Sequence, residues 1–215
     1  GTIASGDYLK QVYPGSLIGA AEAMQCPTIL YNGFGEHRIE GIGDKHIPWI
    51  HNVKNTDMAI GVDDEATISL TRLFNEPAGK QYLVDQGVKP ELVEQLSLFG
   101  ISCIGNMVAT IKMAKHYEMG SGDVLVTVGT DSMEMYSSRV VELQEERGEF
   151  DSHHAAAAYA RHLLGTTTDH LLELSYEDRK RIHNLKYYTW VEQQGKTFEE
   201  IQDQSGLLFF SGLKN

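Results

Sequence analysis

Residues 124–132 read VLVTVGTDS, an uninterrupted apolar run that ends in a cluster of small polar residues. A run of β-favouring residues without polar alternation is typical of a strand that is buried on both faces, as the strands of parallel sheets are. The polar residues 129–132 then fall at the carboxyl end of that strand, where ligands bind in open α/β sheets. This stretch therefore predicts an α/β fold with a candidate ligand site at its end.

Two more apolar runs are predicted to be strands, at 17–21 and at 58–62, and Glu22 follows the first directly. Helical patterns separate the three runs, including a long helix that begins near Gly100 and extends to about Tyr117. Strands that alternate with helices over this length indicate a mostly parallel sheet flanked by helices. Glu22 is then expected at the same edge of the sheet as the polar cluster.

Several helix boundaries can be predicted from single residues. Asp63 or Asp64 is suited to cap the helix that follows the run 58–62, because a carboxylate accepts from free backbone N–H groups. A polar helical insertion is expected over 77–96, with a break at Lys89-Pro90. The first residues, up to Pro14-Gly15, show a rough helical period.

The chain divides by composition near residue 140. Residues 1–140 are expected to form the α/β domain, and residues 141–215 a helical, charged tail that makes packing or oligomer contacts. Two segments of the tail, which begin at Ser175 and at Thr197, resemble capping boxes. An aromatic stripe at helical spacing is expected to pack on the main domain or on a second subunit; it comprises His183, Tyr187, Tyr188, Trp190 and Val191.

Composition excludes some classes of function. Lys and Arg number 18 and Asp and Glu 30, so the net charge is −12. An acidic surface repels phosphate backbones and anionic lipid, which argues against nucleic-acid binding and membrane-surface roles. No apolar stretch approaches the length of a membrane span, and no leader is apparent. Two cysteines, Cys26 and Cys103, make no disulfide framework, so a reduced, cytoplasmic protein is expected.

Motifs for other chemistries are weak. Nine histidines are present, but none has HExxH spacing, and the adjacent His153 and His154 cannot share one helix face, so no metal site is expected. No GxSxG nucleophile elbow occurs. Gly41-Ile42-Gly43 lacks the third glycine of a dinucleotide fingerprint. Cys103 stands at a helix start, where its thiol pKa could be lowered, but a small buried residue is the simpler interpretation.

Four segments carry more information together than any of them alone. They are GTIASGDYLK at 1–10, RIEGIGDKHIP at 38–48, FGISC at 99–103 and TDSMEMY at 130–136. In this order and spacing they resemble the C-terminal half of the fold type II pyridoxal-phosphate enzymes, such as cysteine synthase, cystathionine β-synthase, threonine synthase and the tryptophan synthase β chain. The cysteine synthase branch is the most similar, over about residues 1–140.

The resemblance implies a pyridoxal 5'-phosphate cofactor and specific residues that bind it. Gly1 and Thr2 correspond to the end of the phosphate loop, where a helix N-terminus suits an anion. Gly41 corresponds to the loop beside the cofactor and permits close backbone approach. Ser132 matches the serine that contacts the pyridine nitrogen, although a shift of one residue would put Asp131 there instead. A neutral hydroxyl moderates the electron sink and favours β-elimination and β-replacement on amino acids over transamination.

The departures from the family leave alternatives open. No lysine here, Lys45 included, has the context of the Schiff-base lysine, so the catalytic residues stay unknown. An upstream N-terminal half or a partner subunit is expected to supply that lysine, and a homo-oligomer is expected. The substrate is then an amino acid with a β-leaving group, or a keto-amino acid cleaved by a thiolase-like subunit. The alternatives are a non-catalytic interaction or regulatory subunit that retains the fold, and an unrelated small-molecule-binding α/β domain.

Overall fold

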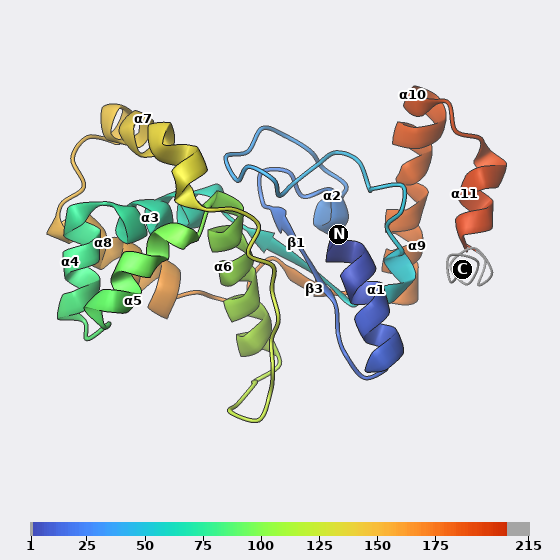
Figure 1. Cartoon of the computed structure of the whole chain (residues 1–215). Helices are drawn as coiled ribbons and strands as arrows, with labels where there is room; N and C mark the ends of the chain where they lie inside the picture. Colours follow the sequence, from blue (N-terminus) through green and yellow to red (C-terminus); the bar gives the residue numbers. More distant parts are fainter. Residues whose placement is uncertain (1, 206–215) are drawn as a thin grey trace.

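The computed structural model describes residues 2–205, and helices dominate them (Figure 1). Three strands form one sheet, with the helices packed around it and beyond its ends. The α-helices are α1 (Thr2–Val12), α2 (Thr28–Tyr31), α3 (Asp64–Asn75), α4 (Pro77–Asp85), α5 (Pro90–Gln95), α6 (Ile101–His116), α7 (Ser137–Arg147), α8 (Ser152–Tyr159), α9 (Tyr176–Asn184), α10 (Glu192–Gln194) and α11 (Phe198–Ser205). Short 3₁₀ turns are η1 (Val53–Asn55), η2 (Leu96–Leu98) and η3 (Met133–Tyr136), and π turns are η4 (Ala160–Leu164) and η5 (Tyr187–Val191).

The sheet is small and mixed. Its order is β1 (Gly19–Ala23), β2 (Met58–Val62), β3 (Leu171–Glu173). The pair β1–β2 is parallel, with Gly19 opposite Met58, and the pair β2–β3 is antiparallel. The α/β class is therefore compatible with the structure, but a mostly parallel sheet is not what the described residues form. The central strand β2 is buried at every position, as its apolar run predicts.

The core lies between the sheet and helices α3 and α6. Met58 and Ile60 of β2 pack with Leu70 and Leu73 of α3 and Ile104 of α6, each almost fully buried. Asp63 caps α3, its side chain accepting from the Glu65 N–H, so one of the two predicted caps is confirmed. The helical insertion is also confirmed: α4 and α5 occupy it, and the chain turns between them before Pro90.

The run 124–128 is not a strand, and this expectation was wrong. The segment is irregular, and Val124, Val126 and Val128 are 83%, 75% and 41% exposed. The reason is that a strand needs a neighbour to pair with, and the sheet of the described residues lies elsewhere. A second correction concerns Glu22, which lies within β1 and not beyond its end.

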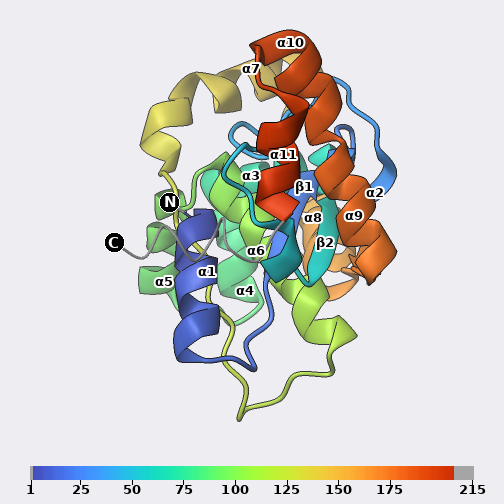
Figure 2. The same ribbon diagram turned by 90° about the vertical axis from the view of Figure 1, so that its right-hand side faces the viewer.

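The tail contributes to the fold of the main domain as far as residue 205. Strand β3 pairs with β2, α8 packs on α3 and α4, and α9 packs on η1. Figure 2 shows α9, α10 and α11 grouped together with the sheet behind them. Both capping boxes are confirmed, at Ser175 with Asp178 and at Thr197 with Glu200. The division at residue 140 stays a prediction, and the apolar end of the chain lies outside the described residues.

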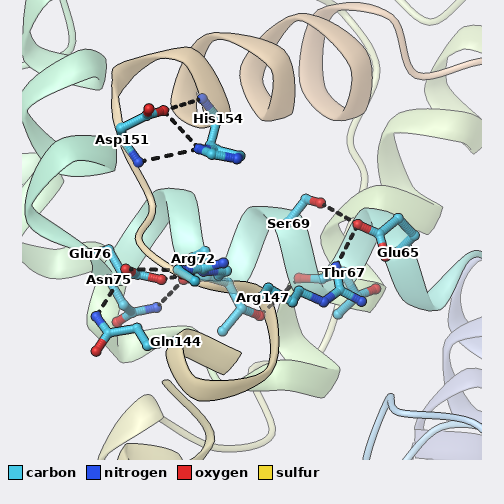
Figure 3. A network of polar contacts seen from close by, with 12 residues as sticks. Glu65, Thr67, Ser69, Arg72, Asn75, Glu76, Gln144, Arg147, Asp151 and His154 are labelled. Carbon is cyan, nitrogen blue, oxygen red and sulfur yellow. Dashed lines mark hydrogen bonds and ion pairs between the residues drawn. The ribbon is translucent and has the colours of Figure 1, made fainter. Parts of the chain in front are cut away.

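A buried ion pair fastens the tail to α3 (Figure 3). The Arg72 and Glu76 side chains bond to each other and are only 5% and 3% exposed. Arg72 also donates to the Gly148 carbonyl at 2.8 Å, and its guanidinium lies over the Phe150 ring. Gln144 of α7 donates to Glu76 at 3.0 Å. These contacts join α3 to α7 and to the connection that leads into α8.

No single helix within residues 2–205 is long and apolar enough to cross a membrane. The segments Pro90–Leu98 and Ile101–His116 reach that length and composition only when taken together, across a bend of 115°. Most of the first three turns of α6 is buried in the core, which accounts for its apolar composition.

Candidate functional site

The loop 38–48 is held against α6 by its own apolar residues. Ile39 and Ile42 are buried, and both approach Gly105 of α6 so closely that a Cβ there would lie 3.2–3.3 Å from them. Between them the backbone turns at Gly41, where φ is +88°, a conformation that favours glycine. A Cβ at Gly41 would lie 3.6 Å from Ser102, so the loop presents bare backbone beside the start of α6.

The start of α6 and the segment 130–132 are in direct contact. The Gly100 N–H donates to the Asp131 carbonyl at 2.9 Å, and any side chain at position 100 would collide with the Asp131 carboxylate. Ser102 bonds through its hydroxyl to that of Thr130. Two of the four segments that carry the family resemblance therefore meet, and the Gly41 loop borders them.

Cys103 also contacts the segment 130–132, from its buried position in α6. Its side chain is buried, as expected for a small core residue, and its Sγ accepts the Thr130 N–H at 3.0 Å. The thiol lies 3.2 Å from the Asp131 carbonyl oxygen, to which it donates. Sulfur is a weak acceptor and a weak donor, so these bonds orient the backbone more than they stabilise it.

The Asp131 carboxylate is the centre of a group of polar side chains that we call the Asp131 cluster: Ser102, Cys103, Thr130, Asp131 and Tyr136. The Tyr136 hydroxyl donates to Oδ2 at 2.6 Å, and the hydroxyls of Thr130 and Ser102 lie 3.2 and 3.4 Å from Oδ1. The bond to the carboxylate, with burial and the negative charge of Asp131, raises the pKa of Tyr136 to about 12. Both carboxylate oxygens of Asp131 are thus engaged within the chain.

Ser132 differs from its neighbour. It is half-buried, and its hydroxyl has no hydrogen-bond partner among residues 2–205. The next residue, Met133, is buried in the core and begins η3, which fixes the position of Ser132 at the edge of the Asp131 cluster. A hydroxyl placed in this way remains free to bond to a ligand.

The structure brings some of the predicted site residues together and not others. Gly41, Asp131 and Ser132 lie around the start of α6. Thr2 begins α1, a helix that bonds elsewhere: Lys10 donates to Asp57, and Asn55 donates to Asp7. Gly1 lies outside the described residues. Whether these two residues hold a phosphate together with the Asp131 cluster stays a prediction.

Three residues of the cluster were not chosen from the sequence: Ser102, Thr130 and Tyr136. All three lie within the segments 99–103 and 130–136 that carry the resemblance. The sequence therefore pointed to the right segments but not to these individual residues. Ser102 reaches Thr130 and Asp131 across 28 and 29 positions of the chain, a contact that a sequence pattern does not reveal. Tyr136 bonds to Asp131 across five positions, through a turn that the sequence did not predict.

Glu22 forms a second buried polar group. Its carboxylate accepts the N–H groups of Ile29 and Leu30 at 2.8 Å, at the start of the short helix α2. Burial raises the pKa of Glu22 to about 7, while these bonds and the charge of Arg181 act in the opposite direction. The carboxylate is committed to backbone groups of α2, and none of its hydrogen bonds within the described residues reaches the Asp131 cluster, so we interpret it as a structural group.

Other features of the described residues do not compete with this site. Within residues 2–205 no group of three or more His, Cys, Asp or Glu is arranged to hold a metal ion. Two shallow hollows, of about 380 and 350 Å³, lie along α9 and between α4 and α5. The first is lined mostly by polar side chains, and the second by polar side chains together with Val84, Val93 and two prolines. Neither lining includes a residue of the Asp131 cluster.

Comparison with known proteins points to one kind of enzyme. Cysteine synthases from Staphylococcus aureus strains Mu50 (ATCC 700699), N315 and MW2 are each 29% identical to the chain over 139 residues. The match covers 64% of this chain but 39% of each of those proteins, so the chain spans well under half of their length. No family model matches the chain, and no solved structure matches it significantly. The similarity supports a relationship to cysteine synthase at the level of a family of amino-acid enzymes.

Proposed function

We propose that this chain forms part of a pyridoxal-phosphate-dependent enzyme of the cysteine synthase type, which acts on amino acids by β-elimination or β-replacement. The observation that carries the proposal is the meeting of three resemblance segments at the Asp131 cluster, which Ser132 directly follows in the chain. The Gly41 loop, the turn at the start of α6 and the segment 130–132 lie far apart in sequence and adjoin in space. The likeness to cysteine synthase extends over 139 residues, which is 64% of this chain.

The donor set fits the pyridine end of the cofactor. Ser132 offers a hydroxyl with no partner in the described part of the chain, and Gly41 offers exposed backbone with no side chain of its own. The Asp131 carboxylate is occupied by the hydroxyls of Tyr136, Ser102 and Thr130, so it is the less suitable of the two neighbours to meet a ring nitrogen. Between the two residues that the sequence leaves open, the contacts favour Ser132.

The bound cofactor would supply an electron sink for the carbanion formed at the substrate Cα. The chain's own residues orient the ring and set its electronics. Ser132 meets the nitrogen with a neutral hydroxyl, which leaves that nitrogen largely without a proton. Asp131 holds its oxygens inside the chain and keeps the backbone of 131–132 in place through Gly100 and Cys103. Gly41 lets the loop approach the ring face.

The Schiff-base lysine is proposed to come from another polypeptide segment, because none of the described lysines lies in the Asp131 cluster. That segment is either joined to this chain or belongs to a partner subunit, and the enzyme is proposed to be a cytoplasmic homo-oligomer. The principal alternative is a non-catalytic subunit that retains the fold. It predicts an intact assembly that binds no pyridoxal phosphate.

The test uses the native assembly, by which we mean the protein purified with whatever polypeptide it is joined to or bound by. We expect a bound pyridoxal absorption band, which shifts in the variant Ser132→Asp because a carboxylate beside the ring nitrogen stabilises its protonated form. The variant Ser138→Ala, at an exposed serine on α7, is the control and should leave the band unchanged. The proposal is contradicted if the native assembly contains no pyridoxal phosphate, or if the wavelength of the absorption band is the same in Ser132→Asp as in the wild type.

A further inference from the structure

The segment 124–128 has the sequence of an interior strand and the environment of an exposed loop. Val124, Val126 and Val128 are 83%, 75% and 41% exposed, and Thr127 is exposed as well. Figure 1 shows the connection from α6 to α7 as an irregular segment that runs back along α6. Only Leu125 packs partly against the main core, and it anchors the segment there.

The backbone of the segment is also unpaired. Apart from the Val128 carbonyl, which accepts from the Asn106 side chain at 3.3 Å, no backbone group of 124–128 bonds to another residue in the range 2–205. Free N–H and C=O groups along both edges of an apolar run form a template for strand pairing. Exposed valines in a row along one segment mark an interaction surface in a protein of this acidity.

We propose that 124–128 becomes a strand by pairing with apolar strands of a polypeptide outside these 215 residues. The inference rests on the proposed function, under which that polypeptide carries the Schiff-base lysine. The chain matches 39% of each cysteine synthase, so more than half of such an enzyme is available to supply the neighbouring strands. Because both edges of the segment and the side chains of Val124, Val126 and Thr127 are open, the occupant is a sheet and its covering layer, not a single added strand.

A second copy of this chain is the less suitable occupant. Pairing about a two-fold axis covers one edge of the segment and leaves the other edge open. A different polypeptide with several apolar strands can cover both edges.

The docking places the partner beside the candidate site. Residues 130–132 follow the segment directly, and Thr130 and Asp131 are fastened to α6 by Cys103 and Gly100. Strands that pair with 124–128 therefore end next to the Asp131 cluster, where a lysine of the partner can reach a ring held by Ser132. The same segment thus joins the two parts of the enzyme and completes its site.

Hydrogen–deuterium exchange tests the inference, read by mass spectrometry on peptides that cover 120–132. In the isolated 215-residue chain these amides should exchange at close to the rate of an unfolded segment. In the native assembly they should be protected by about 100-fold or more, as in a buried strand. Val126→Lys should prevent recovery of the assembly, whereas Val141→Lys, at an exposed valine on α7, should not. Both variant chains should keep the circular dichroism of the parent chain, since both valines are exposed.

Each remaining outcome decides the matter. If the amides of 124–128 are not protected in the native assembly, the docking is overturned. It is also overturned if these amides are protected in the isolated chain and the protection increases with protein concentration, because a second copy is then the occupant. The pyridoxal absorption band is read from the same samples. Bound pyridoxal phosphate with unprotected 124–128 overturns the docking alone. Protection without bound pyridoxal phosphate supports the docking and overturns the proposed function.

Discussion

The Tyr136 hydroxyl lies 2.6 Å from Oδ2 of Asp131 and donates a hydrogen bond to it. This bond closes the turn η3 back onto the segment that enters it. It explains why Asp131 faces inward among hydroxyl groups while Ser132, one position later, stays without a partner in the described part of the chain. The division of roles between the two neighbours follows from this one bond.

The same bond predicts an unusual tyrosine titration. Tyr136 should ionise near pH 12, and Asp131→Asn should return its pKa towards 10, because the anionic acceptor that disfavours the phenolate is gone. The stabilisation by this bond is complete below about pH 10 and is lost as the pH rises through about 12. The ultraviolet absorbance difference between the wild type and Tyr136→Phe isolates this one phenol. A difference that titrates near pH 10 contradicts the bond.

Glu22 should make the protein less stable as the pH rises from about 4.5 to about 7. Its folded pKa, about 7, lies above the unfolded value, so the protonated carboxyl stabilises the fold at low pH and this contribution is lost as the pH rises through 7. The expected size is up to about 3 kcal/mol, since a tenfold change in acidity corresponds to about 1.4 kcal/mol. Urea unfolding of the wild type and Glu22→Gln across this range measures it. Parallel pH profiles for the two proteins would show that Glu22 titrates normally.

Lys186 should have the opposite pH dependence. It is fully buried, and its ammonium donates to the carbonyls of Trp49 and His51 and to Gln204 at 2.7–2.9 Å. Burial nonetheless lowers its pKa to about 8, so the penalty for the charge is relieved and stability rises as the pH rises from about 8 to about 10.5.

Replacing that lysine tests its role as a clamp. Lys186→Met leaves the acceptors unpaired and should cost about 1–3 kcal/mol in the free energy of unfolding. Lys180→Met, at an exposed position on α9, is the matched control and should change little. Thermal unfolding near neutral pH compares them. An equal loss in both variants would argue against the clamp.

The Arg72–Glu76 pair predicts a large loss on breaking one partner and a smaller loss on removing both. Arg72→Met leaves the Glu76 carboxylate buried without its cation, which typically costs about 3–5 kcal/mol. The double variant Arg72→Met, Glu76→Leu should recover part of the loss. Arg38→Met, which breaks a half-exposed pair with Glu146, should be nearly neutral. Denaturant unfolding measures all three, and equal losses for Arg72→Met and Arg38→Met would contradict the burial argument.

Features encoded by neighbouring residues were predictable from the sequence. Asp63 caps α3 and Ser175 caps α9 because a side-chain oxygen one to three residues away suffices to bind the free N–H groups. Strand β2 was predictable because its five residues form a continuous apolar run, and all five are buried as that pattern predicts. Strand β3, of three residues within a helix-rich tail, gave no comparable signal and forms because β2 offers it an edge.

Features that depend on a distant partner were not predictable. The run 124–128 has the apolar pattern of a strand, but a strand forms only where a neighbouring strand is present to pair with it. The choice between Asp131 and Ser132 likewise depends in part on Ser102, 29 positions earlier in the chain, whose hydroxyl lies near Asp131. The resemblance pointed to these segments, and the contacts within them support the roles that we propose.

Borohydride reduction of the native assembly, followed by peptide mapping, tests the central claim most directly. Reduction fixes a bound pyridoxal group to the lysine that holds it. The account predicts a pyridoxyl-lysine in the native assembly, at a lysine outside these 215 residues. A pyridoxyl group on a lysine within this chain, or none anywhere in the assembly, would contradict it.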